Sequence, residues 1–349
     1  MRNTGTVFSR PDNPAAKCLH LTRLSSVITR AELVEATGLS QPTITRAVTA
    51  LIGAGLLAER TDLTQSRGRG RPIIPVKIGD NDWMLAGLAV GTTATYIALY
   101  DNRGRIIAEE DVPTPVASLS EDDFIEHLMA GVHRLSTGSD RKLVSVGVAT
   151  SGSVSPEGLV HAPNLGWDNM DIAQRLRYQF DVPVTVSAAV PAILGSETQT
   201  ASLDNTPTVM VLFADDSLGA ALSNDEGVHT LALPSLNGQA PENTLVTTAI
   251  NKQISKGSNS REVLTHRAQD LGKLAAKLIE AHRPDTLVIA GGAFYDDPQA
   301  PRIFAAEVRA QLKDAPQLRL IPSHRDIVRS IARAVALDPL LRQPLTLNK

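Results

Sequence analysis

The feature that most constrains the fold of this chain is the stretch 29–71, where helix signals and turn signals follow one another closely. From 30 to 36 apolar residues recur about one helical turn apart, which predicts a short amphipathic helix. That helix should end at Gly38, because glycine readily adopts the left-handed conformation of a helix C-cap. Ser40 is a favourable N-cap for a second helix, and Pro42 is tolerated in its first turn. The sequence therefore predicts two short helices joined by a tight turn.

The second of these helices has an apolar face and a polar face. Its predicted inner stripe consists of Ile44, Ala47, Val48 and Leu51. Short polar side chains and an arginine near a helix N-terminus can reach base edges in the major groove of DNA. The predicted DNA contacts of this helix are Ser40, Gln41, Thr43, Thr45 and Arg46. The alternative is that these residues only solvate a surface helix.

Two apolar runs, 56–58 and 73–78, come after the second helix and predict a two-stranded ribbon. Between them arginine alternates with glycine, which makes a thin, positively charged tip suited to the negative potential of a minor groove. The predicted DNA contacts of the tip are Arg67, Arg69 and Arg71. The same segment would also suit a flexible linker. Helix, turn, helix and ribbon together predict a winged helix-turn-helix over residues 1–78.

The charge of the chain is unevenly distributed, although its formal net charge is only -3. Residues 1–78 hold 11 Lys/Arg against 5 Asp/Glu, whereas the rest of the chain holds 23 against 32. A basic head on an acidic body favours a DNA-binding module joined to a sensing module. With 349 residues the chain is also long for a single hydrophobic core, so more than one domain is expected.

Several classes of protein are disfavoured by what the sequence lacks. Cys18 is the only cysteine, so neither a disulfide framework nor a multi-cysteine zinc site is expected. No run of about 18 apolar residues occurs, and no signal-peptide pattern begins the chain. We therefore expect a cytoplasmic protein with no membrane partner.

After residue 78 strand and helix signals alternate. Strands are predicted at 84–100 (broken by a turn), 105–109, 143–149 and 182–186, and helices at 124–135, 170–180 and 191–200. The pattern then repeats more loosely, with strands at 208–213, 219–222, 228–233, 286–290 and 318–321 and helices at 263–282, 302–312 and 326–337. This repetition predicts two α/β lobes at about 79–200 and 201–325, with the C-terminal helix 326–337 returning to the first lobe.

Three segments are expected to lack regular structure, and one histidine is expected to lack fixed contacts. The polar N-terminal residues 1–13 are expected to be disordered. His20 lies in a further helix predicted at 14–28, the first of the head, and is expected to be solvated. The aspartate-containing segment 80–82 is expected to be a hinge. The segment 150–167, rich in Gly, Pro and Ser, is expected to be a long functional loop.

The segments 146–154 (VGVATSGSV), 158–160 (GLV) and 162–167 (APNLGW) resemble the sugar-contacting segment of the ROK family, which comprises sugar kinases and sugar-responsive regulators. The winged helix followed by Gly70-Arg71-Pro72 is similar to the regulator branch of that family. The resemblance covers nearly the whole chain and implies an actin/hexokinase-like fold for residues 79–349. It also implies that a small-molecule effector, a sugar or another metabolite, binds at Ser151, Gly152, Asn164, Trp167 and Ser187. Gly152 and Asn164 could instead only shape the turn, and Trp167 could simply pack.

The chain departs from the family's kinases at the residues that carry chemistry. The resemblance places Ala89 where those kinases have an aspartate beside the phosphate-binding turn, and Ala189 where they have the catalytic base. The second phosphate turn, 216–221, keeps a single glycine, and the cysteines of the family's zinc site are missing. Glu226 and His229 have the spacing of a family sugar motif, but a plain surface turn is the favoured interpretation. We therefore expect no catalytic residue, no metal site, no cofactor and no enzyme activity.

These observations predict an α/β protein in which a winged helix-turn-helix precedes a two-lobed ROK-like domain for effector binding and dimerisation. The predicted function is that of a one-component transcriptional regulator, a homodimer that binds a double-stranded DNA operator. Two alternatives stay open. One is an active sugar kinase with an accessory DNA-binding head, and the other is a constitutive DNA-binding protein with no effector.

Overall fold

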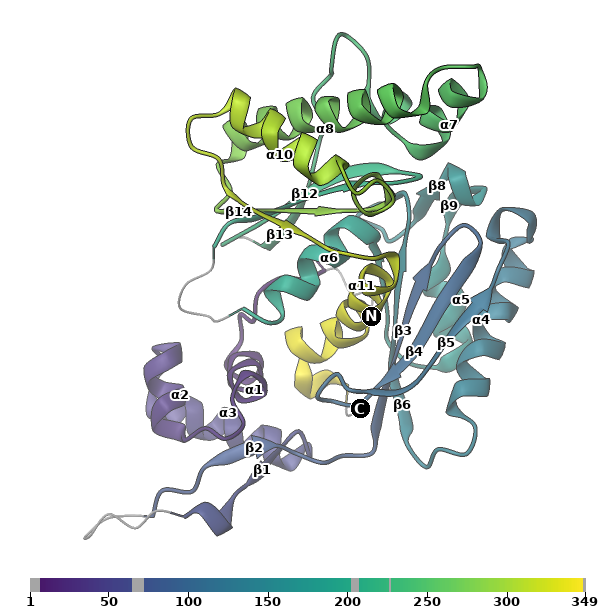
Figure 1. Cartoon of the computed structure of the whole chain (residues 1–349). Coiled ribbons are helices and arrows are strands. Elements are labelled where there is room, and N and C mark those ends of the chain that lie inside the picture. The colour runs from purple at the N-terminus through teal and green to yellow at the C-terminus, as the bar shows by residue number, and fades with distance from the viewer. Residues whose placement is uncertain (1–6, 65–71, 202–206, 226, 348–349) are drawn as a thin grey trace. The chain divides into compact units, whose positions relative to one another are not determined.

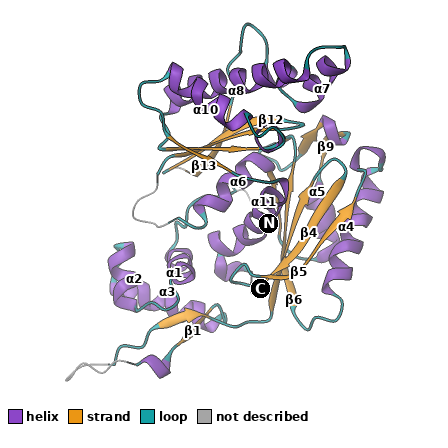
Figure 2. Ribbon diagram, in the orientation of Figure 1, coloured by secondary structure: helices purple, strands orange, loops and turns teal. Residues whose placement is uncertain are grey.

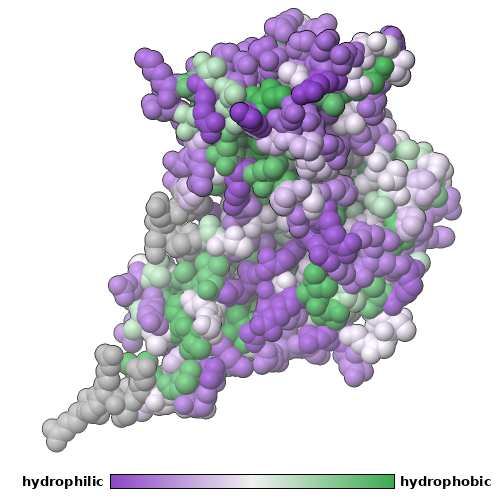
Figure 3. Space-filling model, viewed as in Figure 1, coloured by the Kyte–Doolittle hydropathy of each residue, from purple (hydrophilic) through white to green (hydrophobic). Residues whose placement is uncertain are grey.

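The computed structural model describes residues 7–64, 72–201, 207–225 and 227–347 of the chain. They belong to two compact units (Figure 1; Figure 2). The first unit consists of Met1–Ala188, Gly195–Thr206 and Ile331–Lys349, and the second of Ala189–Leu194 and Pro207–Ser330. Polar residues dominate the face of the molecule seen in Figure 3. Within the described ranges no helix is long and apolar enough to cross a membrane.

The N-terminal part of the first unit is a winged helix, as predicted. The side chains of Asn13, Thr29 and Ser40 cap its three helices by accepting a backbone N–H from the first turn. Gly38 ends the second helix with a φ of 66°, the left-handed conformation that favours glycine. The wing strands pair in antiparallel fashion. The elements are α1 (Pro14–Leu24), α2 (Arg30–Thr37), α3 (Gln41–Gly53), β1 (Leu57–Glu59) and β2 (Val76–Ile78).

A five-stranded mixed sheet in the order β10-β6-β3-β4-β5 forms the body of the first unit. Its strands are β3 (Trp83–Val90), β4 (Ala94–Tyr100), β5 (Ile106–Pro113), β6 (Lys142–Thr150) and β10 (Val184–Ala188). Helices α4 (Glu121–Ser136) and α5 (Ile172–Phe180) cover one face, and α11 (His324–Arg342) lies against the other (Figure 1). Gly87 and Gly147 allow α11 to approach, because a Cβ atom there would lie 2.2 Å and 2.3 Å, respectively, from its backbone.

The segment expected to be a long loop forms a small antiparallel sheet instead. Its strands are β7 (Ser153–Val154), β8 (Val160–Ala162) and β9 (Trp167–Met170). Val160, Ala162, Trp167 and Met170 are buried in the same apolar core as α4 and α5. Strands of two to four residues have too little periodicity to stand out among the Gly, Pro and Ser of the turns, which is why the prediction was wrong.

The second unit has its own five-stranded sheet in the order β13-β12-β11-β14-β15. The strands are β11 (Val209–Ala214), β12 (Leu218–Asn224), β13 (Gly227–Leu231), β14 (Thr286–Ala290) and β15 (Gln317–Leu320). The helices are α7 (Thr247–Ser255), α8 (Ser260–His282), α9 (Gly292–Tyr295) and α10 (Ala300–Gln311). The sequence did not predict α7, which has only three apolar residues. Helix α6 (Ala189–Thr198), like α11, contributes residues to both units.

Three local expectations for the first unit are wrong. Phe8, in the N-terminal segment expected to be disordered, is buried. His20, expected to be solvated, is buried, and its Nε2 lies 2.8 Å from the carbonyl oxygen of Ala201. The presumed hinge is anchored, because Asp80 forms an ion pair with Arg103 at 2.6 Å. The winged helix is therefore attached to the body by fixed contacts.

Candidate functional site

Helix α3 presents a polar N-terminal surface on an apolar base. Its apolar stripe is buried as predicted and consists of Ile44, Ala47, Val48 and Leu51. The predicted DNA-contacting residues Ser40, Gln41, Thr45 and Arg46 are exposed, and Thr43 is half-buried. The hydroxyl oxygens of Ser40 and Thr43 lie 2.8 Å apart, which orders the first turn. The exposed side chains at this end of α3 therefore form one surface.

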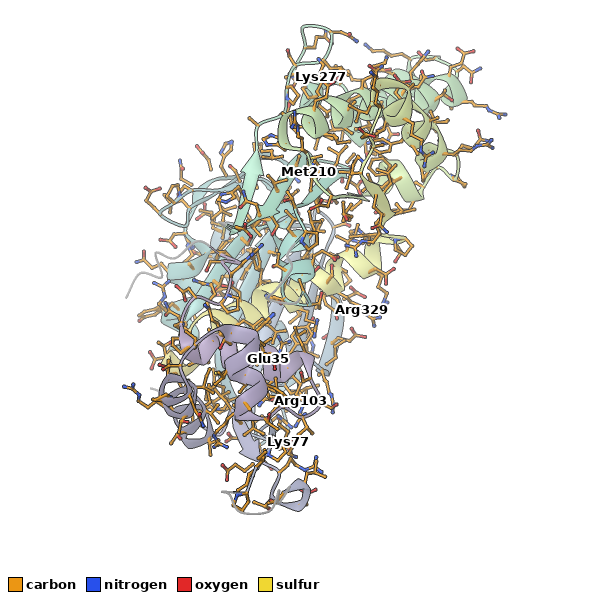
Figure 4. The ribbon with its side chains drawn as sticks, turned by 90° about the vertical axis from the view of Figure 1, so that its left-hand side faces the viewer. Glu35, Lys77, Arg103, Met210, Lys277 and Arg329 are labelled. Carbon is orange, nitrogen blue, oxygen red and sulfur yellow. The ribbon has the colours of Figure 1, made fainter. Side chains whose placement is uncertain are left out.

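Arg46 is the basic residue of α3, and no described carboxylate pairs with it. Its Nε donates only a long hydrogen bond, 3.4 Å, to the carbonyl oxygen of Pro42. Arg30, by contrast, pairs with Glu59 at 2.8 Å. Lys77 pairs likewise with an aspartate at the base of the wing, where it lies beside Arg103 (Figure 4). Arg46 thus keeps its positive charge available for a partner.

The arginine–glycine tip of the wing lies between β1 and β2 in the sequence. Arg67, Arg69 and Arg71 lie outside the described residues, so their DNA contacts stay a prediction. Directly after β1, on the tip side of the wing, Arg60 donates to the carboxylate of Asp62 at 2.7 Å. This pair is fully intramolecular and adds no free charge to the ribbon.

Three of the predicted effector-binding residues lie together at the carboxyl end of β6. Asn164 Nδ2 donates to the hydroxyl of Ser151 at 3.0 Å, and both residues are half-buried. Gly152 has a φ of 81°, and a Cβ atom there would lie 2.2 Å from the carbonyl oxygen of His161, so only glycine fits. Ligands of α/β sheets bind outside the carboxyl ends of parallel strands. A hydroxyl and an amide at this edge suit a ligand with hydroxyl groups.

Trp167 and Ser187 are less accessible than the other predicted residues. Trp167 is 3% exposed, and its ring centroid lies 4.8 Å from that of Phe124, which supports the packing alternative. Ser187 is buried near the end of β10, and its hydroxyl donates to the carbonyl of Ala188 at 2.9 Å. The accessible part of the predicted set is therefore Ser151, Gly152 and Asn164.

The two positions at which the family resemblance places catalytic carboxylates are occupied by alanine. Ala89 is buried at the end of β3, opposite Ala149 of β6. Ala189 is the first residue of α6 and carries a methyl group. Neither side chain can accept a proton. In the part of the chain that the structure describes, no three His, Cys, Asp or Glu residues are grouped so as to hold a metal ion.

The second unit contains a polar cluster around Asp215 that the sequence did not predict. Its Oδ2 accepts the backbone N–H of Gly292 at 2.8 Å and the hydroxyl of Tyr295 at 3.1 Å. Its Oδ1 accepts the backbone N–H of Asp216 at 3.0 Å. Burial and the charge of Asp215 raise the pKa of Asp216 and of Tyr295. These donors would suit an external oxyanion, but the chain's own carboxylate occupies them.

Arg267 of α8 supplies the positive charge of this cluster. It is 6% exposed; its Nε donates to the carbonyl of Leu245 at 2.8 Å and its Nη2 to the hydroxyl of Thr247 at 3.2 Å. Burial lowers the pKa of Arg267, whereas Asp215 and its neighbours act in the opposite sense. The position of Arg267 on the inner face of α8, one turn before Leu271, is the sequence signal that could have indicated a buried polar network.

The ROK family model matches residues 85–230 of this chain. A transcriptional regulator of Mycobacterium tuberculosis is 28% identical over 96% of this chain and 87% of its own length. The xylose repressor of Bacillus subtilis is 25% identical over 46% of this chain and 42% of its own length. The N-acetylglucosamine repressor of Escherichia coli is 26% identical over 49% of this chain and 42% of its own length.

Solved structures share the fold. The crystal structure of a ROK family transcriptional regulator, a homologue of the E. coli MLC protein, superposes with a TM-score of 0.74 at 17% identity, covering 96% of this chain and all of that one. The ROK hexokinase from Thermus thermophilus gives a TM-score of 0.59 at 17% identity, covering 73% of this chain and 98% of that one. The regulator thus matches nearly the whole chain, whereas the hexokinase leaves about a quarter of it unmatched. Residues 85–230 therefore match the ROK family, and the chain as a whole shares the fold of a ROK regulator, a winged helix followed by a two-lobed actin/hexokinase-like body.

Proposed function

We propose that this protein is a one-component transcriptional regulator whose head, residues 1–78, binds operator DNA and whose body, residues 79–349, senses a small molecule. The observation that carries the proposal is the exposed polar end of α3 with the unpaired guanidinium of Arg46. Relatives named as regulators and repressors support the same function.

In the proposed complex α3 lies in the major groove, where its N-terminal side chains reach base edges. The arginines of the wing tip contact the minor groove or the phosphates. A homodimer would place two copies of α3 about 34–36 Å apart, one helical turn of DNA, on a pseudo-palindromic site. Specificity then comes from α3, and much of the salt-dependent affinity comes from the tip.

We propose that the body does not transfer phosphate. Ala89 and Ala189 offer no carboxylate to hold a metal-nucleotide or to deprotonate a sugar hydroxyl. In the second unit, the donors that could bind a phosphate oxygen are already bonded to Asp215. The lobes, at about 79–200 and 201–325, would then serve ligand binding in the cytoplasm.

The proposed effector site is built on Ser151, Gly152 and Asn164. A sugar or another hydroxylated metabolite would exchange hydrogen bonds with the hydroxyl and the amide, which bond each other in the structure. Binding regulates DNA affinity only to the extent that the effector prefers one arrangement of the protein over another.

The DNA-binding proposal is tested by selecting fragments of genomic DNA with the purified protein and mapping the bound sites. On such a site Arg46→Ala should weaken binding by about 1–3 kcal/mol, while its binding to random DNA changes little. Arg134→Ala, which removes an exposed arginine from the body, is the matched control and should leave both affinities unchanged. Failure of the wild-type protein to select any DNA would refute the proposal.

The role of the body is tested separately. Protein incubated with ATP, Mg²⁺ and a panel of hexoses should yield no sugar phosphate, whereas turnover would favour the kinase alternative. A thermal-shift screen of metabolites should find a compound that raises the melting temperature of wild-type protein, because a ligand of the folded state stabilises it. Asn164→Ala should abolish that shift. A regulator that binds DNA but responds to no metabolite would be the constitutive alternative.

A further inference from the structure

We infer that the C-terminal end of α11 is a clamp that positions the DNA-binding head, an inference that rests on the proposed function. The clamp is the pair Asp338 and Arg342, one turn apart on α11, with side chains 1% and 6% exposed. Arg342 Nη2 and Nε lie 2.6 Å and 2.8 Å from Asp338 Oδ2. A buried ion pair contributes little net stability compared with apolar residues of the same size, so its role is better sought in specific positioning.

Each member of the clamp holds the N-terminal part of the chain. The other carboxylate oxygen of Asp338, Oδ1, accepts the backbone N–H of Phe8 at 2.8 Å. The carbonyl oxygen of Arg342 accepts a hydrogen bond from Asn13 Nδ2 at 2.8 Å. Asn13 Oδ1 also accepts the N–H of Ala16 at 2.9 Å and so caps α1. One side chain therefore ties the first helix of the head directly to α11.

Phe8 adds a second, apolar anchor. It is 3% exposed, and its ring packs so closely on α6 that a Cβ atom at Gly195 would lie 2.3 Å from it. Phe8 also has a φ of 61°, a left-handed conformation that is rare for a bulky side chain. Such a conformation persists only where the surroundings impose it. The bond to Asp338 and the tight fit at Gly195 are the contacts that impose it.

The head is held at other points as well. The turn 344–346 directly after α11 contacts both α1 and α3. At the base of the wing Asn102 Nδ2 donates to the carbonyl of Gly79 at 2.8 Å, and Arg103 Nη2 donates to that of Ile78 at 2.8 Å. These contacts hold the head against the rest of the first unit at both of its ends. In a dimer, a fixed orientation of each head fixes the separation of the two copies of α3.

The junction nevertheless has features of a surface that can separate. A small cavity of about 30 Å³ lies between Phe8, His20, Gln199 and the clamp pair. The side-chain oxygen of Gln199 is buried there without a hydrogen-bond partner in the described structure. In an ordinary domain core such cavities are few and nearly all buried polar atoms are hydrogen-bonded, so this junction is packed less completely than a core. The helix α11 itself begins with residues of the second unit and ends at the clamp.

The double variant Asp338→Leu/Arg342→Leu tests the clamp, because an apolar pair of similar size is tolerated in the fold but offers no acceptor to Phe8. Asn13→Ser is the second variant, since serine still caps α1 but is too short to reach Arg342. The matched control is Glu110→Leu/Arg134→Leu, which removes an exposed ion pair of the same unit.

The first readout is amide hydrogen exchange of the full chain without DNA. Both clamp variants should lose protection in α1 and at the base of the wing while keeping it in β3 and β6, and the control should match wild type. Unchanged protection in α1 would overturn the inference, whether or not the protein proves to bind DNA.

The second readout uses the duplex that the wild-type protein selects from genomic DNA, re-synthesised with the spacing between half-sites changed one base pair at a time. Wild type should bind best at one spacing, whereas the clamp variants should bind an isolated half-site normally and lose that optimum. A variant that keeps a sharp spacing optimum would overturn the inference. Absence of any selected duplex would refute the proposed function and leave the exchange experiment to decide on the clamp.

Discussion

Arg267 is the residue whose replacement tests the polar cluster of the second unit most directly. Arg267→Leu removes a buried guanidinium that donates to the carbonyl of Leu245 at 2.8 Å and to the hydroxyl of Thr247 at 3.2 Å. A hydrogen bond from a charged donor contributes about 1.5–3 kcal/mol, and the second bond is the longer one. The neighbouring carboxylates are partly exposed, so solvent screens their attraction to the guanidinium, and losing that attraction adds little to the cost. We expect the free energy of unfolding to fall by about 2–4 kcal/mol.

The loss of unfolding free energy in Arg267→Leu should depend on pH, which a loss of packing alone would not cause. Burial and Asp215 already raise the pKa of Asp216, and removing Arg267 should raise it further. A carboxyl group with a raised pKa in the folded state contributes stability below its unfolded pKa, about 4, and loses that contribution as pH rises through the folded pKa. The difference in unfolding free energy between wild type and the variant should therefore be smaller at about pH 4.5 than at about pH 7.5.

Urea and thermal unfolding followed by circular dichroism measure both effects. A loss of this size should lower the unfolding midpoint of the second unit by roughly 6–12 °C. Lys273→Leu is the control on the same helix, because its exposed pair with Asp270 should contribute less than about 1 kcal/mol. A deficit for Arg267→Leu no larger than that of the control, or equal at both pH values, would refute the assignment of a buried charged network.

Three further predictions concern the first unit. Replacing Arg67, Arg69 and Arg71 together by glutamine should reduce the slope of log DNA affinity against log salt concentration by the equivalent of about three phosphate contacts. An unchanged slope would mean that the tip is a linker. Burial lowers the pKa of His20, so the wild-type protein should lose stability as pH falls below about 6.5. His20→Gln keeps a donor for the carbonyl of Ala201 and should lose less stability between about pH 7.5 and 5.5. Equal losses of the two proteins in urea unfolding would contradict this. Gly147→Val would place a Cβ atom 2.3 Å from the backbone of α11 and should destabilise the fold by about 3 kcal/mol or more, whereas Gly53→Ala, with open space around it, should be neutral or stabilising in the same assay.

The head could be predicted closely because its signals are local. Ser40, Gly38 and Thr29 act on backbone groups within a few residues, so their types at those positions specify where α2 and α3 begin and end. The inner stripe of α3 follows from the helical period alone. The prediction erred by only a residue or two at the ends of these helices, where fraying makes boundaries least determined.

What could not be predicted depends on contacts between residues far apart in the sequence. Nothing near Phe8 or His20 indicates that Asp338 and Ala201, more than 150 residues away, will bury them. Trp167 could be assigned either to a ligand or to the core, and only the position of Phe124 decides in favour of packing. The same holds for the effector site, where sequence placed Ser151 and Asn164 in one loop but could not show that they bond each other.

The residues that remain in the body separate two roles that a kinase fold combines. Gly87, Gly147 and Gly291 all stand where a Cβ atom would come within about 2.3 Å of a backbone atom, so the close approaches that define the two sheets require glycine. The family resemblance places Ala89 and Ala189 where the kinases carry carboxylates, and here Ala89 is a buried residue of β3 and Ala189 begins α6. Packing and chemistry therefore make independent demands on this fold. Under the proposed function, a body that meets the packing demand without the chemical one serves to bind a ligand rather than to transfer phosphate.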